Sequence, residues 1–106
     1  MSYDVSLTIK TGKEETEVTD CGNYTYNASS MYQHAMGASL GEFNGTSCKT
    51  AIPILKRGVK EMINNPGIHR ALQPENGWGN YEGALKFLET ILSNCEKYYK
   101  CTIRVN

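Results

Sequence analysis

No stretch of this sequence approaches the about 18 consecutive apolar residues that a membrane-spanning helix needs. The first residues, Met1-Ser2-Tyr3-Asp4, have neither the basic start nor the apolar centre of a signal peptide. Neither sign of charge is in excess, because eleven basic residues balance eleven acidic ones. A protein that binds the DNA backbone in general needs a basic surplus. We therefore expect a cytoplasmic protein without a membrane partner, and we do not expect non-specific DNA binding.

The spacing motifs of metal, redox and hydrolytic sites are also missing. The four cysteines are Cys21, Cys48, Cys95 and Cys101. They form no Cys-x-x-Cys pair, and His34 and His69 do not stand at Cys/His ligand spacing. There is no Gly-x-Ser-x-Gly elbow and no His-Glu-x-x-His motif. The sequence thus predicts no catalytic residue, metal ligand or cofactor, and favours a protein that is not an enzyme.

The cysteines permit two interpretations. Their even number allows disulfides, whereas a cytoplasmic location favours reduced thiols. Cys48 stands near the start of an expected helix, where the helix dipole can lower the pKa of a thiol. It is a weak candidate for a nucleophile, because no base is placed beside it.

Alternating apolar and polar residues predict β-strands at both ends of the chain. From Tyr3 to Ile9 the period is two, which is typical of a strand with one buried face. A turn and a weaker, polar strand over residues 16–19 complete a hairpin. Residues 101–105 alternate in the same way. Because an isolated hairpin is marginally stable in water, we expect the last strand to join it in one sheet.

Between the strands the apolar period changes to that of helices. Apolar stripes cover residues 28–36, 52–63 and 84–95, and residues 68–72 allow one further helical turn. We therefore expect one α+β domain over residues 1–106, in which a small antiparallel sheet packs against three to four helices. The sheet should have about three strands, with the N- and C-terminal strands among them.

The expected helix ends follow from residues that cap helices. Asn27 is the candidate N-cap of the first helix, and Gly37 its stop signal. The second helix should start near Thr50, with Thr50 or Ser47 as its cap. Asn80 is the expected N-cap of the last helix.

The segment Asn76-Gly77-Trp78-Gly79-Asn80-Tyr81 is the first candidate binding site. It holds the only tryptophan of the chain between two glycines, directly before the clearest helix. Unpaired peptide groups at a helix start can hold an anion, and an exposed tryptophan can anchor a partner. A tight corner with its tryptophan packed inward explains the same residues, and both interpretations stay open.

The segment Asn23-Tyr24-Thr25-Tyr26-Asn27 is the second candidate. Its amides can hydrogen-bond a base edge and its phenols can stack on a base, although a strand that runs into a cap explains it equally. If it lies beside Trp78, the two segments form a cleft that suits a nucleotide. The phosphates of such a ligand would then require Arg57, His69 or Arg70 nearby.

Four stretches resemble small uncharacterised proteins of tailed bacteriophages and prophages. The stretches are Met1-Ser2-Tyr3-Asp4-Val5, Asn23-Tyr24-Thr25-Tyr26-Asn27, Ile52-Pro53-Ile54-Leu55-Lys56 and Gly77-Trp78-Gly79-Asn80-Tyr81-Glu82-Gly83-Ala84-Leu85. The resemblance implies a setting, the cytoplasm of an infected bacterium, and no particular chemistry. Proteins of that setting often counter host defences or redirect host enzymes.

The preferred hypothesis is a non-enzymatic accessory protein that acts by binding, most plausibly against a host defence system. Its partner is a host protein or, ranked slightly lower, a signalling nucleotide that it sequesters. A small hydrolase or transferase acting on a nucleotide or host protein is one alternative, and a virion or scaffold component is another. Self-association into a homo-oligomer is left open.

Overall fold

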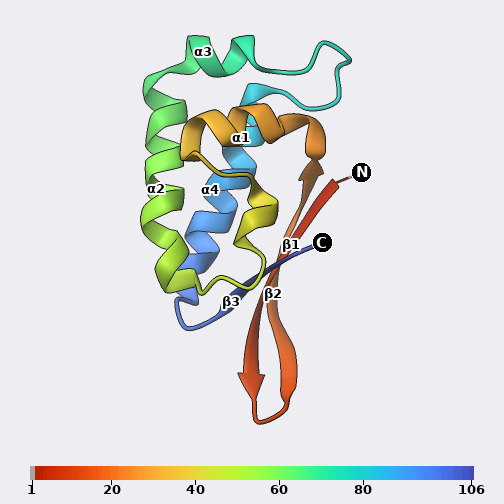
Figure 1. Cartoon of the computed structure of the whole chain (residues 1–106), viewed down its shortest axis with the longest axis vertical. Helices are drawn as coiled ribbons and strands as arrows, with labels where there is room; N and C mark the ends of the chain where they lie inside the picture. The colour runs from red at the N-terminus through yellow and green to blue at the C-terminus, as the bar shows by residue number, and fades with distance from the viewer. Residues whose placement is uncertain (1) are drawn as a thin grey trace.

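A computed structural model describes residues 2–106 and has the expected α+β architecture (Figure 1). Its strands are β1 (Ser2–Thr11), β2 (Glu14–Thr25) and β3 (Thr102–Val105). Its helices are α1 (Ser29–Met36), α2 (Cys48–Asn64), α3 (Pro66–Ala71) and α4 (Tyr81–Lys97). Two short 3-10 helices, η1 (Tyr26–Ala28) and η2 (Leu40–Phe43), flank α1. In the described part of the chain, none of the helices combines the length and apolar character that crossing a bilayer requires.

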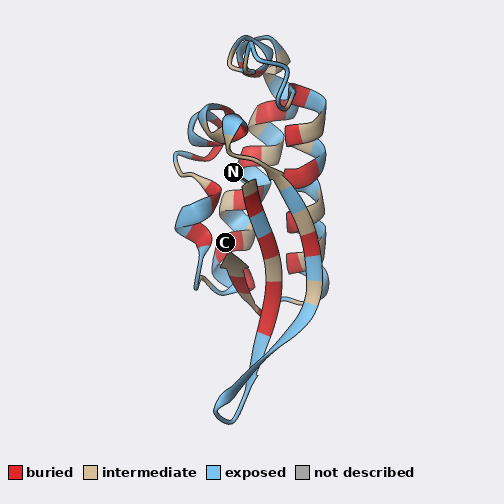
Figure 2. Ribbon diagram, turned by 90° about the vertical axis from the view of Figure 1, so that its right-hand side faces the viewer, coloured by how far each residue is buried: buried red, intermediate tan, exposed pale blue. Residues whose placement is uncertain are grey.

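The sheet has the order β2-β1-β3, and both pairings are antiparallel. Val5 pairs with Val105 and Leu7 with Ile103, so the first and last strands are neighbours, as expected. The second strand is much longer than the predicted residues 16–19. Most of it is exposed, and Figure 2 shows the hairpin tip lying away from the helices. An exposed edge strand has no buried face, and hence no alternation to reveal its length.

The helices α1, α2 and α4 pack together on one side of the sheet (Figure 1). The core lies between them and β1, whose Tyr3, Val5 and Leu7 are buried (Figure 2). Ile9, toward the hairpin tip, is exposed, so the buried face of the strand ends before it. Its largest fully buried side chains include Leu7, Tyr32, Leu55, Leu88 and Ile91. The predicted apolar stripes of the helices thus supply most of this core.

The predicted helix ends at Asn80 and Gly37 are confirmed, whereas the start of the second helix was predicted two residues too late. Asn80 caps α4 by accepting a hydrogen bond from the Gly83 N–H at 2.7 Å, and Gly37 ends α1 in a left-handed conformation with φ of 73°. The second helix begins at Cys48 rather than near Thr50. Ser47 is its cap, because its Oγ accepts from the Thr50 N–H at 3.2 Å.

Asn27 is not the N-cap of the first helix, so that prediction is wrong. The chain leaves β2 through η1, whose cap is Thr25, and Thr25 Oγ1 accepts from the Asn27 N–H at 3.2 Å. The α-helix proper begins two residues later, at Ser29. The extra 3-10 turn leaves the Asn27 side chain exposed at the end of the sheet.

Candidate functional site

The two segments singled out from the sequence meet at the end of the sheet. Tyr24, near the end of β2, lies against the start of α4. Its hydroxyl accepts from the Asn80 N–H at 2.9 Å and lies 3.2 Å from the Asn80 carbonyl, to which it donates. Residues that are 56 positions apart in the chain are therefore joined by two hydrogen bonds.

Glycines allow this close approach. Gly79 has a φ of 96°, and a Cβ atom there would lie 2.6 Å from Thr25 Cγ2. A Cβ atom at Gly83 would clash with the Tyr24 hydroxyl oxygen. Gly77 has open space around it, and its φ of 78° is needed for the turn itself. The glycines thus serve a tight corner, as one of the two interpretations of the sequence held.

The tryptophan, however, does not pack inward. Trp78 is 68% exposed, the largest exposure among the exposed large apolar side chains of the described chain. Its backbone N–H donates to Asn76 Oδ1 at 2.9 Å, which fixes the loop that carries it. The corner therefore presents the indole to solvent, and this favours the anchor interpretation.

Trp78 borders an open groove of about 750 Å³ between its own loop and the β2–η1 segment. We call this the Trp78 groove; the described residues that line it are Ser2, Asn23, Thr25, Tyr26, Asn27, Asn76 and Trp78. Tyr26 is held in place by the ring of Tyr3, whose centroid lies 4.4 Å from its own. Three amides and two aromatic rings give the groove several hydrogen-bond donors and acceptors beside apolar surface.

None of the described residues that line the Trp78 groove is charged. Asn23 also borders a smaller cavity of about 160 Å³, which Asp4, Glu17 and Asp20 line. Carboxylates next to the groove repel an anionic ligand and attract a cationic one. The surroundings of the groove are therefore acidic rather than basic.

The cations expected for a nucleotide site do not line this groove. The Arg57 guanidinium donates to the Met36 carbonyl at 3.0 Å, between α2 and α1. Arg70 pairs with Glu82 at 3.0 Å and lies 4.8 Å above the ring of Tyr81.

Of the remaining candidates, Tyr81 and Tyr24 have structural roles. Tyr81 is buried, and its hydroxyl donates to the Met62 carbonyl at 2.6 Å. Tyr24 is half-buried and stacks on Phe87 with a centroid distance of 5.8 Å. The tyrosines and asparagines of the predicted set thus line the groove or hold its two segments in place, whereas Arg57, His69 and Arg70 do not line it.

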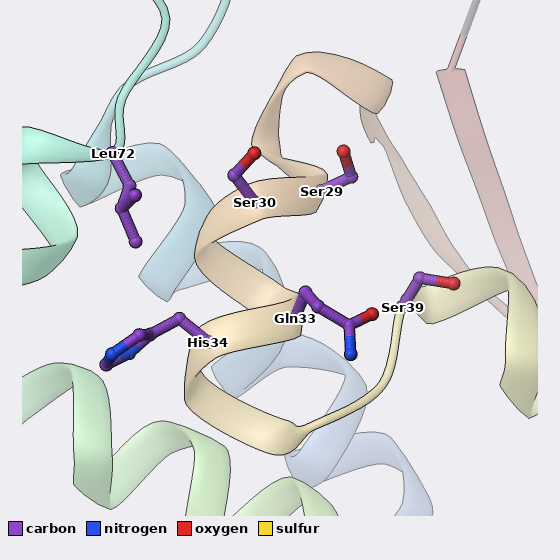
Figure 3. A pocket seen from close by; sticks show the side chains of 6 residues that line it. All are labelled: Ser29, Ser30, Gln33, His34, Ser39 and Leu72. Carbon is purple, nitrogen blue, oxygen red and sulfur yellow. The ribbon is translucent and has the colours of Figure 1, made fainter.

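His69, the last of the predicted cations, is buried beside His34 at the junction of three helices. His34 comes from α1, His69 from α3 and Glu61 from α2, and the candidate ligand atoms of the three lie within 4.8 Å of one another. Figure 3 shows His34 on the side of α1 that faces Leu72, at the edge of an open cavity of about 650 Å³. The sequence offers no signal for this cluster, because its members share no helix.

The four cysteines are buried and unbridged. Burial raises the pKa of the Cys21 thiol to about 11, and it also raises the pKa of Cys48. Burial of Cys48 and its raised pKa argue against the idea that it is an activated nucleophile. The reduced-thiol interpretation fits the structure.

The fold and these sites define a small α+β protein with an amide-lined aromatic groove and a histidine–carboxylate cluster. Comparison with models of protein families, with curated proteins and with solved structures gave no match.

Proposed function

We propose that this protein acts by binding another protein in the Trp78 groove, as an accessory protein of a tailed bacteriophage or prophage. Its target would be a protein of a host defence system in the bacterial cytoplasm. The resemblance of four stretches to small phage and prophage proteins supports the setting. The shape and chemistry of the groove support the mode of action.

The exposed indole of Trp78 is the observation that carries the proposal. A tryptophan that is 68% exposed leaves most of its large apolar surface in water unless a partner covers it. Tryptophan is among the residues most enriched at the energetic centres of protein interfaces. The hydrogen-bonded loop that carries Trp78 also limits the ordering entropy that binding would cost.

The charges around the groove favour a protein over a signalling nucleotide. A nucleotide brings phosphates, whereas the described lining of the groove holds no cation and its neighbour holds three carboxylates. A protein segment can place an apolar side chain over Trp78, peptide groups against Asn23, Asn27 and Asn76, and a Lys or Arg toward the acidic cavity. A partner segment of this composition fits the groove.

The test is capture of partners by tagged wild-type protein and by two variants, from infected bacteria. Trp78→Ala removes the indole, and Tyr99→Ala is the matched control, because Tyr99 is also exposed and follows the opposite end of α4. Captured proteins are then purified and their direct binding is measured. A tryptophan hot spot contributes about 2 kcal/mol or more, so Trp78→Ala should weaken direct binding by about 30-fold or more.

The proposal requires that Tyr99→Ala keeps wild-type affinity and that both variants stay folded. Equal binding by wild type and Trp78→Ala would rule out the groove as the interface. Cyclic dinucleotides or cyclic ADP-ribose variants could instead raise the unfolding temperature of the wild type and leave that of Trp78→Ala unchanged. This result would identify a nucleotide, and not a protein, as the ligand of the groove.

A small hydrolase or transferase remains the second candidate, because one observation favours it. Such an enzyme needs titratable groups that converge in a cleft, and His34 lies close to Glu61 at the edge of a cavity. Wild-type protein should then turn over a nucleotide or protein substrate, and His34→Ala should not. Turnover that survives His34→Ala would exclude this assignment.

A further inference from the structure

The cluster of His34, Glu61 and His69 is built from three helices, with one residue each from α1, α2 and α3. Their burial differs in a useful way: His69 is fully buried, Glu61 is half-buried and His34 is exposed. One ligand of such a site is fixed in the protein interior, and another is in contact with solvent. Neither the Trp78 groove nor its proposed partner involves these residues.

The distance between the two imidazoles matches that of ligands on one metal ion. His34 Nδ1 lies 3.2 Å from His69 Nε2. Zinc–nitrogen bonds of about 2.0–2.1 Å at the tetrahedral angle place two ligand nitrogens about 3.3 Å apart. An N–H···N hydrogen bond also has this length, so measured metal binding has to distinguish the two arrangements.

The tautomer of His69 is determined by its backbone partner. His69 Nδ1 lies 2.8 Å from the carbonyl oxygen of Asn65, which can only accept a hydrogen bond. The proton of a neutral His69 is therefore on Nδ1, and the lone pair of Nε2 faces His34. A ring that donates to a backbone carbonyl through one nitrogen and offers the other is the usual arrangement of a metal-binding histidine.

Asn65 also orients the third member of the cluster. Its side-chain Nδ2 donates to Glu61 Oε1 at 3.0 Å, while its backbone carbonyl accepts the hydrogen bond from His69 Nδ1. One residue thus holds a carboxylate and an imidazole in position. His34 needs only to carry its own proton on Nε2, and its exposed ring can do so with solvent as the partner.

The geometry points to a zinc site, in which His34 Nδ1, His69 Nε2 and one Glu61 carboxylate oxygen bind a single Zn²⁺ ion. Two imidazoles and a carboxylate are a donor set that Zn²⁺ uses with a water as fourth ligand. An open cavity borders His34, so solvent can reach the site from that side (Figure 3). The ion would tie α3, which lies across the end of α2, to α1 and α2 (Figure 1).

The test measures binding of Zn²⁺, and of Co²⁺ as its spectroscopic substitute, to full-length protein stripped with a chelator. We expect one Zn²⁺ per chain, a rise in the unfolding temperature, and slower hydrogen exchange in α3. The Co²⁺ spectrum should be that of a tetrahedral site without thiolate-to-cobalt charge transfer, since the cysteines take no part. That last readout separates this site from metal bound by the four thiols.

Two exposed or half-exposed ligands can be replaced with little risk to the fold. His34→Ala and Glu61→Gln should each weaken Zn²⁺ binding by at least about 100-fold, because even loss of a supporting residue around a metal costs about 10–100-fold. The matched controls are Gln33→Ala, the exposed neighbour on α1, and Glu89→Gln, an exposed carboxylate on α4. Both should bind Zn²⁺ like the wild type.

Three results would overturn the inference. The first is a wild-type protein that binds no Zn²⁺ at concentrations well above micromolar. The second is equal binding by wild type, His34→Ala and Glu61→Gln. The third is thiolate-to-cobalt charge transfer in the Co²⁺ complex of folded protein, which would assign the metal to the cysteines.

Discussion

Gly58 shows how closely α2 approaches its neighbours. A Cβ atom at this position would fall on Met36 Cγ of α1 and would lie 3.3 Å from Leu88 Cδ2 of α4. Overpacking of this kind costs about 1–3 kcal/mol, while alanine in place of glycine gains about 1 kcal/mol of helix propensity. We expect Gly58→Ala to lower the free energy of unfolding by about 1 kcal/mol, measured by urea denaturation.

Gly67 provides the comparison, because it is also helical but a Cβ atom at its position would meet no neighbouring group within 4 Å. Gly67→Ala should raise the free energy of unfolding by about 0.4–1 kcal/mol through loss of unfolded-chain entropy. If Gly58→Ala raises the free energy of unfolding as Gly67→Ala does, steric contact is not what limits residue 58.

The cap residues show how far the ends of helices can be predicted from single residues of the sequence. Asn80 and Gly37 are recognisable because their side chains, or the lack of one, meet a purely local need of the backbone. Asn27 misleads because Thr25 caps a 3-10 turn just before it. Both residues are good caps, and only the tertiary path of the chain decides between them.

Among the elements, the exposed part of the hairpin is tied to the rest of the sheet by Glu15. This residue of β2 accepts from Thr8 Oγ1 of β1 at 2.7 Å, and from Arg104 Nη2 of β3 at 3.0 Å. The bonds to Arg104 and then to Thr8 lower the pKa of Glu15 from 4.5 to about 2. One carboxylate thereby links all three strands.

This linkage makes stability depend on pH in a defined direction. A carboxyl with a lower pKa in the folded state stabilises the fold above its unfolded pKa of 4.5, and the contribution is lost as the pH falls toward 2. The urea midpoint of wild type should therefore fall between pH 5 and about pH 2 more steeply than that of Glu15→Gln. If the urea midpoints of the two proteins depend on pH in the same way, Glu15 contributes nothing to the pH dependence of stability.

The elements also explain which sites could be predicted. The two segments that line the Trp78 groove could be named from the sequence, because each is compact and ends a strand or starts a helix. That they lie side by side could not be predicted, because they meet only in the folded chain. The cluster of His34, Glu61 and His69 was not, because its residues come from three helices and meet only after these pack. The length of β2 was missed since an exposed strand carries no pattern of burial.

For the whole molecule, the reactivity of the cysteines can show whether the helices and the sheet unfold together. The cysteines come from β2, α2, α4 and the position just before β3, and all four are buried. The Cys48 N–H donates to the Cys101 carbonyl at 2.8 Å, so the middle of the chain is bonded to its end. Because all four residues are buried, we expect a reagent to reach their thiols mainly when helices and sheet separate.

Thiol labelling of the native protein should therefore be limited by unfolding. Burial raises the pKa of each cysteine, which keeps the thiols protonated, and a domain stable by about 5 kcal/mol exposes them in fewer than about one molecule in 1000. We expect all four to react with an aromatic disulfide reagent at one common rate, about 1000-fold slower than in urea-unfolded protein. Ser93→Cys, at an exposed position of α4, should add one fast-reacting thiol and leave the slow phase unchanged. A fast phase in the wild type would mean that part of the molecule opens independently, and the number of thiols in that phase would identify the part.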